Sequence, residues 1–151
     1  MSTETKPPPC PGILETGIYA DDLDAATRFY RDLLGLEVLV AKPGRHVFFR
    51  LPTGMLLVFR AAATRVSGDP ARPGHLAHGA EGPGHVCFAA TGDALDRWRA
   101  HLQAAGVAIE DDFEWPNGAR SIYVRDPAGN SVEFAEPRLW GITLPPAAPA
   151  G

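Results

Sequence analysis

Residues 125–134, with the sequence RDPAGNSVEF, decide the fold because residues 50–59, RLPTGMLLVF, repeat their frame. Arg, Pro, Gly and Phe recur at the same places 75 residues apart, and Glu133 stands where the first stretch has Val58. In each stretch the Pro-x-Gly triplet predicts a turn between two strands, since proline presets φ and glycine accepts positive φ. The repeat indicates that the chain is a duplicated module.

Each module is predicted to run in the order β-α-β-β-β. Alternating or apolar runs predict strands, and an i, i+3, i+4, i+7 pattern predicts each helix, with aspartates as N-cap candidates (Asp21, Asp22 or Asp24 in the first module, Asp93 in the second). Aligning the first strands places His85 over Glu15 at a spacing of 70 residues, so we expect a connection about five residues longer in the second module, within residues 111–118. The predicted strands are residues 13–20, 36–41, 45–51 and 55–60, and then 84–90, 107–112, 120–125 and 131–136.

Proline and glycine divide the chain into segments. We predict a flexible N-terminal arm, a first βαβββ module, a Gly- and Pro-rich connector, a second βαβββ module and a C-terminal tail. The corresponding ranges are residues 1–12, 13–60, 61–83, 84–136 and 137–151.

Composition excludes several classes of partner. The net charge of −4 and the lack of a Lys/Arg run argue against nucleic acid and anionic membrane surfaces. No apolar run approaches the roughly 20 residues that a membrane span needs, and residues 1–11 lack the apolar core of a signal peptide. Cys10 and Cys87 do not form a disulfide framework, so we expect a cytoplasmic protein.

Three residues at equivalent places in the repeat could bind a metal. Two copies of a module normally pack about a pseudo-twofold axis, so we expect Glu15 to face His85 and Val58 to face Glu133. One imidazole and two carboxylates suit a divalent ion such as Mn²⁺, Fe²⁺, Ni²⁺, Co²⁺ or Zn²⁺. The alternative for each residue alone is a solvent-facing or hydrogen-bonded structural side chain.

Other side chains are candidates for contacts with a substrate. Arg45 and Arg120 occupy equivalent positions and could clamp an anionic group, although pairing with surface carboxylates explains them too. His78, with His75, lies in the connector and could close over the site, or could be a solvated loop residue. Four aromatic residues could line an apolar pocket or pack in the core: Tyr19, Phe49, Tyr123 and Trp115.

Three stretches together resemble the vicinal oxygen chelate superfamily: ATRFYRDLLGL at residues 26–36, GHVCF at 84–88 and YVRDPAGNSVEF at 123–134. This family includes glyoxalase I, extradiol dioxygenases, methylmalonyl-CoA epimerase, fosfomycin-modifying enzymes and the metal-free bleomycin-binding proteins. The resemblance covers residues 13–136. It implies an α+β fold in which two βαβββ modules form an open, eight-stranded cup around a metal ion.

By position, the resemblance implies that His85 and Glu133 are metal ligands. Glu15 stands where the family commonly has histidine, and the fourth ligand position of glyoxalase I falls on Val58, which cannot coordinate. These departures count against an unmodified glyoxalase I site and make extradiol ring cleavage a weaker interpretation.

Two functions remain open. The first is a divalent-metal-dependent enzyme, a lyase, isomerase or dioxygenase, that acts on a small substrate with neighbouring oxygens and uses Glu133 or Glu15 as proton acceptor. The second is a metal-free protein that sequesters a small molecule or drug, as bleomycin-resistance proteins do. The resemblance implies a homodimer in either case, and leaves open whether the modules pair within one chain or between two.

Overall fold

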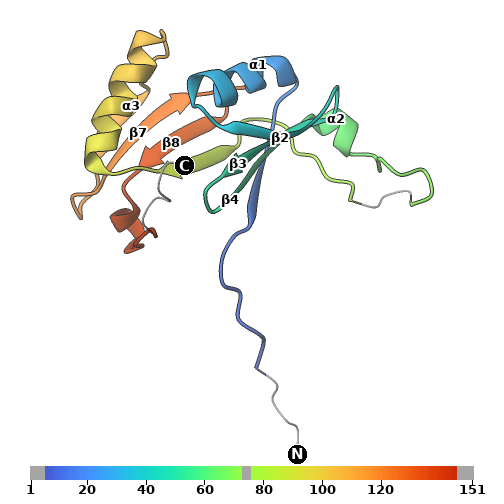
Figure 1. The fold of residues 1–151 in the computed structure, drawn as a ribbon, viewed down its shortest axis with the longest axis horizontal. Helices are drawn as coiled ribbons and strands as arrows, with labels where there is room; N and C mark the ends of the chain where they lie inside the picture. Colours follow the sequence, from blue (N-terminus) through green and yellow to red (C-terminus); the bar gives the residue numbers. More distant parts are fainter. Residues whose placement is uncertain (1–5, 73–75, 146–151) are drawn as a thin grey trace, which may run out of the picture.

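The computed structural model describes residues 6–72 and 76–145 and contains two modules of the same topology (Figure 1). The strand orders are β1-β4-β3-β2 and β5-β8-β7-β6, with the first and last strand of each module parallel and the others antiparallel. The predicted α+β fold of two open βαβββ modules is therefore confirmed.

The first module contains β1 (Glu15–Tyr19), α1 (Leu23–Thr27), the π-helix η1 (Arg28–Leu33), β2 (Glu37–Lys42), β3 (His46–Leu51) and β4 (Gly54–Phe59). The second contains β5 (His85–Ala89), α3 (Gly92–Ala104), β6 (Asp111–Glu114), β7 (Arg120–Arg125) and β8 (Ser131–Ala135).

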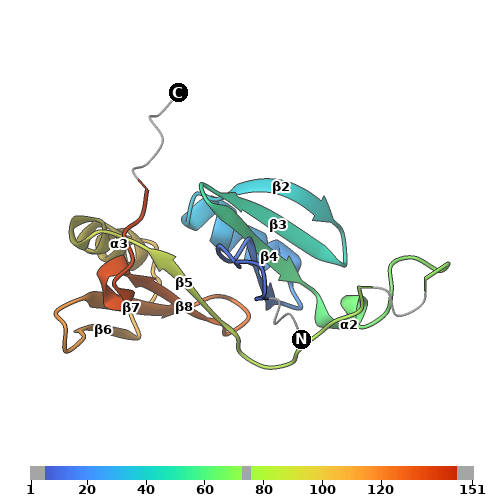
Figure 2. The ribbon, with the colours of Figure 1, turned by 90° about the horizontal axis from the view of Figure 1, so that it is seen from below.

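Two short helices lie outside the modules. The helix α2 (Ala61–Thr64) begins the connector, which projects from the body of the molecule, and the 3-10 helix η2 (Pro137–Trp140) follows β8 (Figures 1 and 2). The sequence pattern did not indicate either one. Among the residues that the structure describes, none of the helices has the length and hydrophobicity needed to cross a membrane.

The helix caps differ in part from the expectation. Asp22, one of the three candidates, caps α1 by accepting a hydrogen bond from the Ala25 N–H at 2.8 Å. In the second module the cap is Thr91, whose side chain accepts from the Ala94 N–H, and not Asp93. Asp93 lies instead in the first turn of α3, where a negative charge interacts favourably with the helix dipole.

The prediction for β6 was wrong in its bounds. Residues 107–110 connect α3 to the sheet, and the strand begins at Asp111, opposite Tyr123. The turn that follows, residues 115–119, replaces a turn of residues 43–45 in the first module. This longer turn lies largely in the segment where the repeat spacing predicted extra length.

One hydrophobic core joins the two modules. The helices within the modules, α1, η1 and α3, lie on the same side of the two sheets (Figure 1). The core includes Ile18, Tyr30 and Val58 from the first module with Leu95 and Phe134 from the second. The residues that alternate with these core positions point to the opposite side of each sheet. We call these two surfaces the first and the second open face.

A buried polar knot fixes the modules to each other. Tyr30 donates its O–H to the Asp126 carboxylate at 2.7 Å, and the Asn130 side chain donates to both Asp126 and the Tyr19 carbonyl at 2.9 Å. The side-chain Oδ1 of Asn130 also accepts from the Gly84 N–H at 2.7 Å. The turn motif that revealed the repeat therefore also carries contacts between the modules.

The strand register corrects one equivalence drawn from the repeat. Tyr123 pairs with Glu133 in the second sheet, and its counterpart Phe48 pairs with Leu57 in the first. Leu57, not Val58, is therefore the structural counterpart of Glu133; Val58 points into the core. The β7–β8 turn is one residue longer than the β3–β4 turn, which shifts the ungapped alignment by one position. Leu57 is as unable to coordinate a metal as Val58.

Candidate metal centre on the second open face

Glu133 lies at the centre of the second open face. It belongs to β8, pairs with Cys87 of β5 on one side and with Tyr123 of β7 on the other, and is only 5% exposed. One oxygen, Oε2, lies 3.3 Å from Nε2 of His85. The other, Oε1, is buried without a hydrogen-bond partner among the described residues. A buried carboxylate oxygen left in this state costs free energy unless a cation or proton neutralises it.

The orientation of His85 adds a second indication. Its Nδ1 lies 3.1 Å from the Ser131 carbonyl oxygen, which can only accept, so Nδ1 carries the proton in this contact. In a neutral ring Nε2 then presents a lone pair to the Glu133 carboxylate, and in a protonated ring it donates a hydrogen bond to that carboxylate. Two acceptors that face each other at 3.3 Å repel unless a proton or a metal ion lies between or beside them. His85 and Glu133 therefore have a donor set that fits a divalent cation.

Glu133 also affects the neighbouring ionisable groups. Two causes raise the pKa of the Cys87 thiol to about 12: the larger is partial loss of hydration, and the second is the negative charge of Glu133. Burial and the same carboxylate raise the pKa of the Tyr123 hydroxyl well above its ordinary value. In the metal-free protein both groups are therefore protonated at neutral pH.

Cys87 is expected to react slowly with iodoacetamide in the metal-free protein. At pH 8 a thiol of pKa about 12 has a much smaller thiolate fraction than a free cysteine, and we expect alkylation to be slower by roughly 10- to 100-fold. Glu133→Gln should accelerate it several-fold by removing the negative charge, whereas Glu114→Gln should not. The rate is measured by mass spectrometry in a Cys10→Ser background. A rate for Cys87 equal to that of free cysteine would contradict this electrostatic description.

Glu15 does not join His85 and Glu133 within one chain. It is exposed at the start of β1, on the first sheet. Over the described ranges 6–72 and 76–145, no three His, Cys, Asp or Glu side chains lie close enough to share a metal ion. Glu15 as a ligand therefore stays a prediction.

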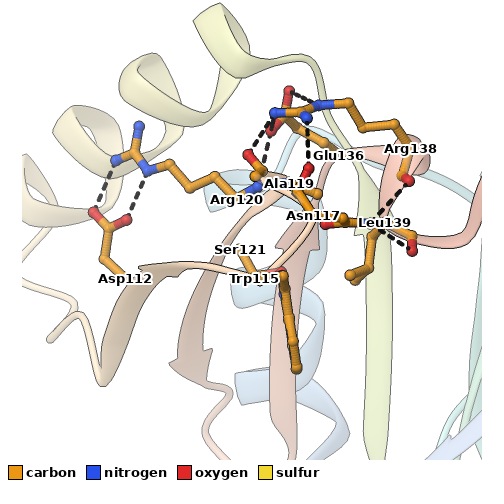
Figure 3. A network of polar contacts seen from close by, with 10 residues as sticks. Asp112, Trp115, Asn117, Ala119, Arg120, Ser121, Glu136, Arg138 and Leu139 are labelled. Carbon is orange, nitrogen blue, oxygen red and sulfur yellow. Dashed lines mark hydrogen bonds and ion pairs between the residues drawn. The ribbon is translucent and has the colours of Figure 1, made fainter.

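The two symmetry-related arginines make structural contacts. Arg120 binds Asp112 through two hydrogen bonds of 2.7 and 2.8 Å and Asp96 through a third of 2.6 Å (Figure 3 shows the Asp112 pair). Arg45 donates to the carbonyl oxygens of Ala63 and Val66. A role of either arginine as an anion clamp remains an untested prediction, and binding an anion would require these contacts to break.

The turn after β6 holds Trp115 at the rim of the second open face. The Trp115 indole N–H donates to the Ser121 hydroxyl at 2.8 Å, and its backbone N–H donates to the Ala119 carbonyl at 2.7 Å. Two contacts attach this turn to η2: the Asn117 side-chain amide donates to the Leu139 carbonyl, and the Arg138 guanidinium donates to the Asn117 carbonyl (Figure 3). The Phe113 ring lies 4.8 Å from Trp115 and stacks on Tyr123 at 6.0 Å.

The remaining candidates divide between core and surface. Phe49 is fully buried in the core, whereas Tyr19 lies on the first open face and donates or accepts a hydrogen bond of 2.8 Å with His78 Nδ1. His75 lies outside the described residues. His46 was not among the candidates from the sequence; it is partly buried and stacks on Phe48 at 4.2 Å. The sequence signal that could have placed His46 on the open face is its alternation with the core residue Val47.

Comparisons with known proteins bear on the family and fold of this chain. The family model of the glyoxalase/bleomycin resistance protein/dioxygenase superfamily matches residues 12–134. The chain belongs to this superfamily. One solved structure of the superfamily fold, described as lactoylglutathione lyase from Agrobacterium tumefaciens, is 45% identical with a TM-score of 0.83, covering 89% of this chain and 100% of the other. A glyoxalase/bleomycin resistance protein/dioxygenase from Nocardioides is 24% identical with a TM-score of 0.67, covering 96% of this chain and 91% of the other, and shows the superfamily fold alone.

Proposed function

We propose that this protein is a divalent-metal-dependent enzyme that acts on a small substrate with two neighbouring oxygens. The observation that carries the proposal is the pair formed by His85 and Glu133, 3.3 Å apart, in which the buried carboxylate keeps one oxygen without a partner among the described residues. Because the similar Agrobacterium protein is described as a lyase, we favour lyase or isomerase chemistry over oxygenation.

We propose that two chains complete the site. His85 and Glu133 supply two ligands from the second open face, and Glu15 of a second chain supplies the third. This arrangement is supported by the position of Glu15 on the first sheet, whereas His85 and Glu133 lie on the second, and no three candidate ligands come together in the described part of the chain. The protein would then act as a homodimer in which each site contains both modules.

The residues of the second open face have distinct roles in this proposal. A bound divalent ion would supply Lewis-acid stabilisation of negative charge on the two substrate oxygens. The Ser131 carbonyl holds the His85 ring in the tautomer that leaves Nε2 free. Glu133 Oε1, which has no donor among the described residues, or Glu15 would accept a proton from the carbon next to a substrate oxygen. Trp115 and Phe113 limit the access of water from the rim.

Proton exchange on a simple substrate analogue tests this function. In D₂O, the metal-loaded protein is expected to catalyse deuterium incorporation at the carbon-bound protons of hydroxyacetone next to the oxygens, as followed by NMR. Chelator-treated protein and Glu133→Gln should show only the buffer rate, and Glu114→Gln should match the wild type. Tight metal binding without exchange would contradict the proton-transfer step, and protein that binds no metal would favour metal-free sequestration of a small molecule.

A further inference from the structure

The first open face is lined by aromatic rings. His46 stacks on Phe48 with ring centres 4.2 Å apart, and Phe48 packs edge-to-face on Phe59 at 5.3 Å. All three rings are partly exposed in the single chain. With Tyr19 and His78 they form what we call the ring cluster.

The connector completes the ring cluster. His78 lies 4.5 Å from the Phe59 ring in an edge-to-face arrangement, and its Nδ1 lies 2.8 Å from the Tyr19 hydroxyl. Its backbone N–H donates to the Thr64 carbonyl at the end of α2. Three contacts therefore hold His78 over the edge of the first open face, 19 residues after β4 ends.

The two open faces differ in chemistry at matching positions. Where the second face carries Glu133, Tyr123 and Ser121, the strand register of the first face places Leu57, Phe48 and His46. At these three matched positions every side chain of the second face is polar, whereas only His46 is polar on the first. Phe48, together with Phe59, offers ring surfaces that suit an apolar part of a ligand.

The surroundings of His46 disfavour a positive charge on its ring. Burial, together with the charges of Arg45 and Lys42, lowers the pKa of His46 below its ordinary value. The cations of this face lie at its margins: Lys42 pairs with His46 from the edge strand β2, and Arg50 lies 3.7 Å from Glu37. A surface of several aromatic rings favours a flat ring as its ligand.

We propose that the ring cluster binds a flat aromatic or conjugated ring of the substrate while its oxygens lie at His85 and Glu133. Tyr19, Phe48, Phe59 and His78 are then specificity-determining residues. The orientation of the whole substrate rests on the proposed two-chain metal site. Binding of the ring itself does not require the metal.

Calorimetric titration of chelator-treated protein with 2-naphthol tests the proposal. The saturated analogue decahydro-2-naphthol has the same carbon skeleton without a π-face and is expected to bind about fivefold more weakly. Phe59→Leu and His78→Ala should each weaken 2-naphthol binding by about two- to tenfold. Trp140→Leu is the control, because it changes an aromatic side chain that is 77% exposed and lies outside the cluster. It should leave the affinity for 2-naphthol unchanged.

The outcomes separate this proposal from the proposed function. The ring-cluster proposal would be overturned by any of three results: equal binding of the two naphthol analogues, no binding of 2-naphthol, or unchanged affinity of His78→Ala for 2-naphthol. His78 is exposed, so this variant remains informative even where Phe59→Leu does not fold. Since the titration uses metal-free protein, failure of the chain to bind metal would contradict the proposed function and leave the ring-cluster result standing.

Discussion

Glu133→Gln is expected to raise the free energy of unfolding of the metal-free protein by about 1–3 kcal/mol, because the substitution removes a buried charge with one unpartnered oxygen. The same substitution should weaken divalent-metal binding by at least about 100-fold, since even the loss of an outer-shell partner costs roughly 10- to 100-fold. The two effects have opposite signs. If Glu133 had a purely structural role, its replacement would instead destabilise the protein.

Denaturant unfolding and a metal titration monitored by calorimetry measure the two effects. Glu114→Gln, at an exposed position of β6, is the matched control and should change neither quantity. Loss of stability in metal-free Glu133→Gln, together with unaltered metal affinity, would show that Glu133 is a structural residue.

Asp126→Ala is expected to lower the free energy of unfolding by about 3–5 kcal/mol. The Asp126 carboxylate is buried and accepts hydrogen bonds from four donors: the Tyr30 O–H, the Asn130 side chain and the backbone N–H groups of Ala128 and Asn130. Removing it leaves these donors without their acceptor and loosens the contact between the modules. The decrease is measured as a shift in the midpoint of urea unfolding.

Tyr30→Phe separates the contributions within this knot. It removes one hydrogen bond to a charged group and keeps the ring, so we expect a loss of about 1.5–3 kcal/mol, smaller than that of Asp126→Ala. Asp32→Ala, at an exposed position on η1, should stay within about 0.5 kcal/mol of the wild type. A loss below about 1 kcal/mol for Asp126→Ala would contradict the role of the knot.

The repeat predicted the modular fold because turn chemistry and strand alternation are local properties of the sequence. It could not predict the register of the last strand, since the two turns differ by one residue and the motif letters aligned equally well without a gap. For this reason the sequence repeat matched Glu133 with Val58, whereas its structural counterpart is Leu57. The cap at Thr91 was missed because an aspartate two residues later offered the same chemistry.

The candidate site was predictable only in part. The strand positions of His85 and Glu133 placed them on one face, and the structure brings their side chains to 3.3 Å. The contact between His78 and Tyr19 spans 59 positions in the sequence and depends on the path of the connector, which carries no periodic signal. The engagement of Arg120 with Asp112 and Asp96 depends on how α3 packs on the second sheet, which a repeat does not specify.

The central claim is that one chain supplies Glu15 and another supplies His85 and Glu133 to the same metal ion. The most direct test is the metal content of a heterodimer purified with two different tags from co-expressed Glu15→Ala and Glu133→Ala chains. Each parent homodimer lacks an intact ligand set and should hold no tightly bound metal. The heterodimer contains one site with all three native ligands, so we predict one metal ion per pair of chains by mass spectrometry. A heterodimer as free of metal as its parents, beside a metal-loaded wild-type protein, would contradict the shared site.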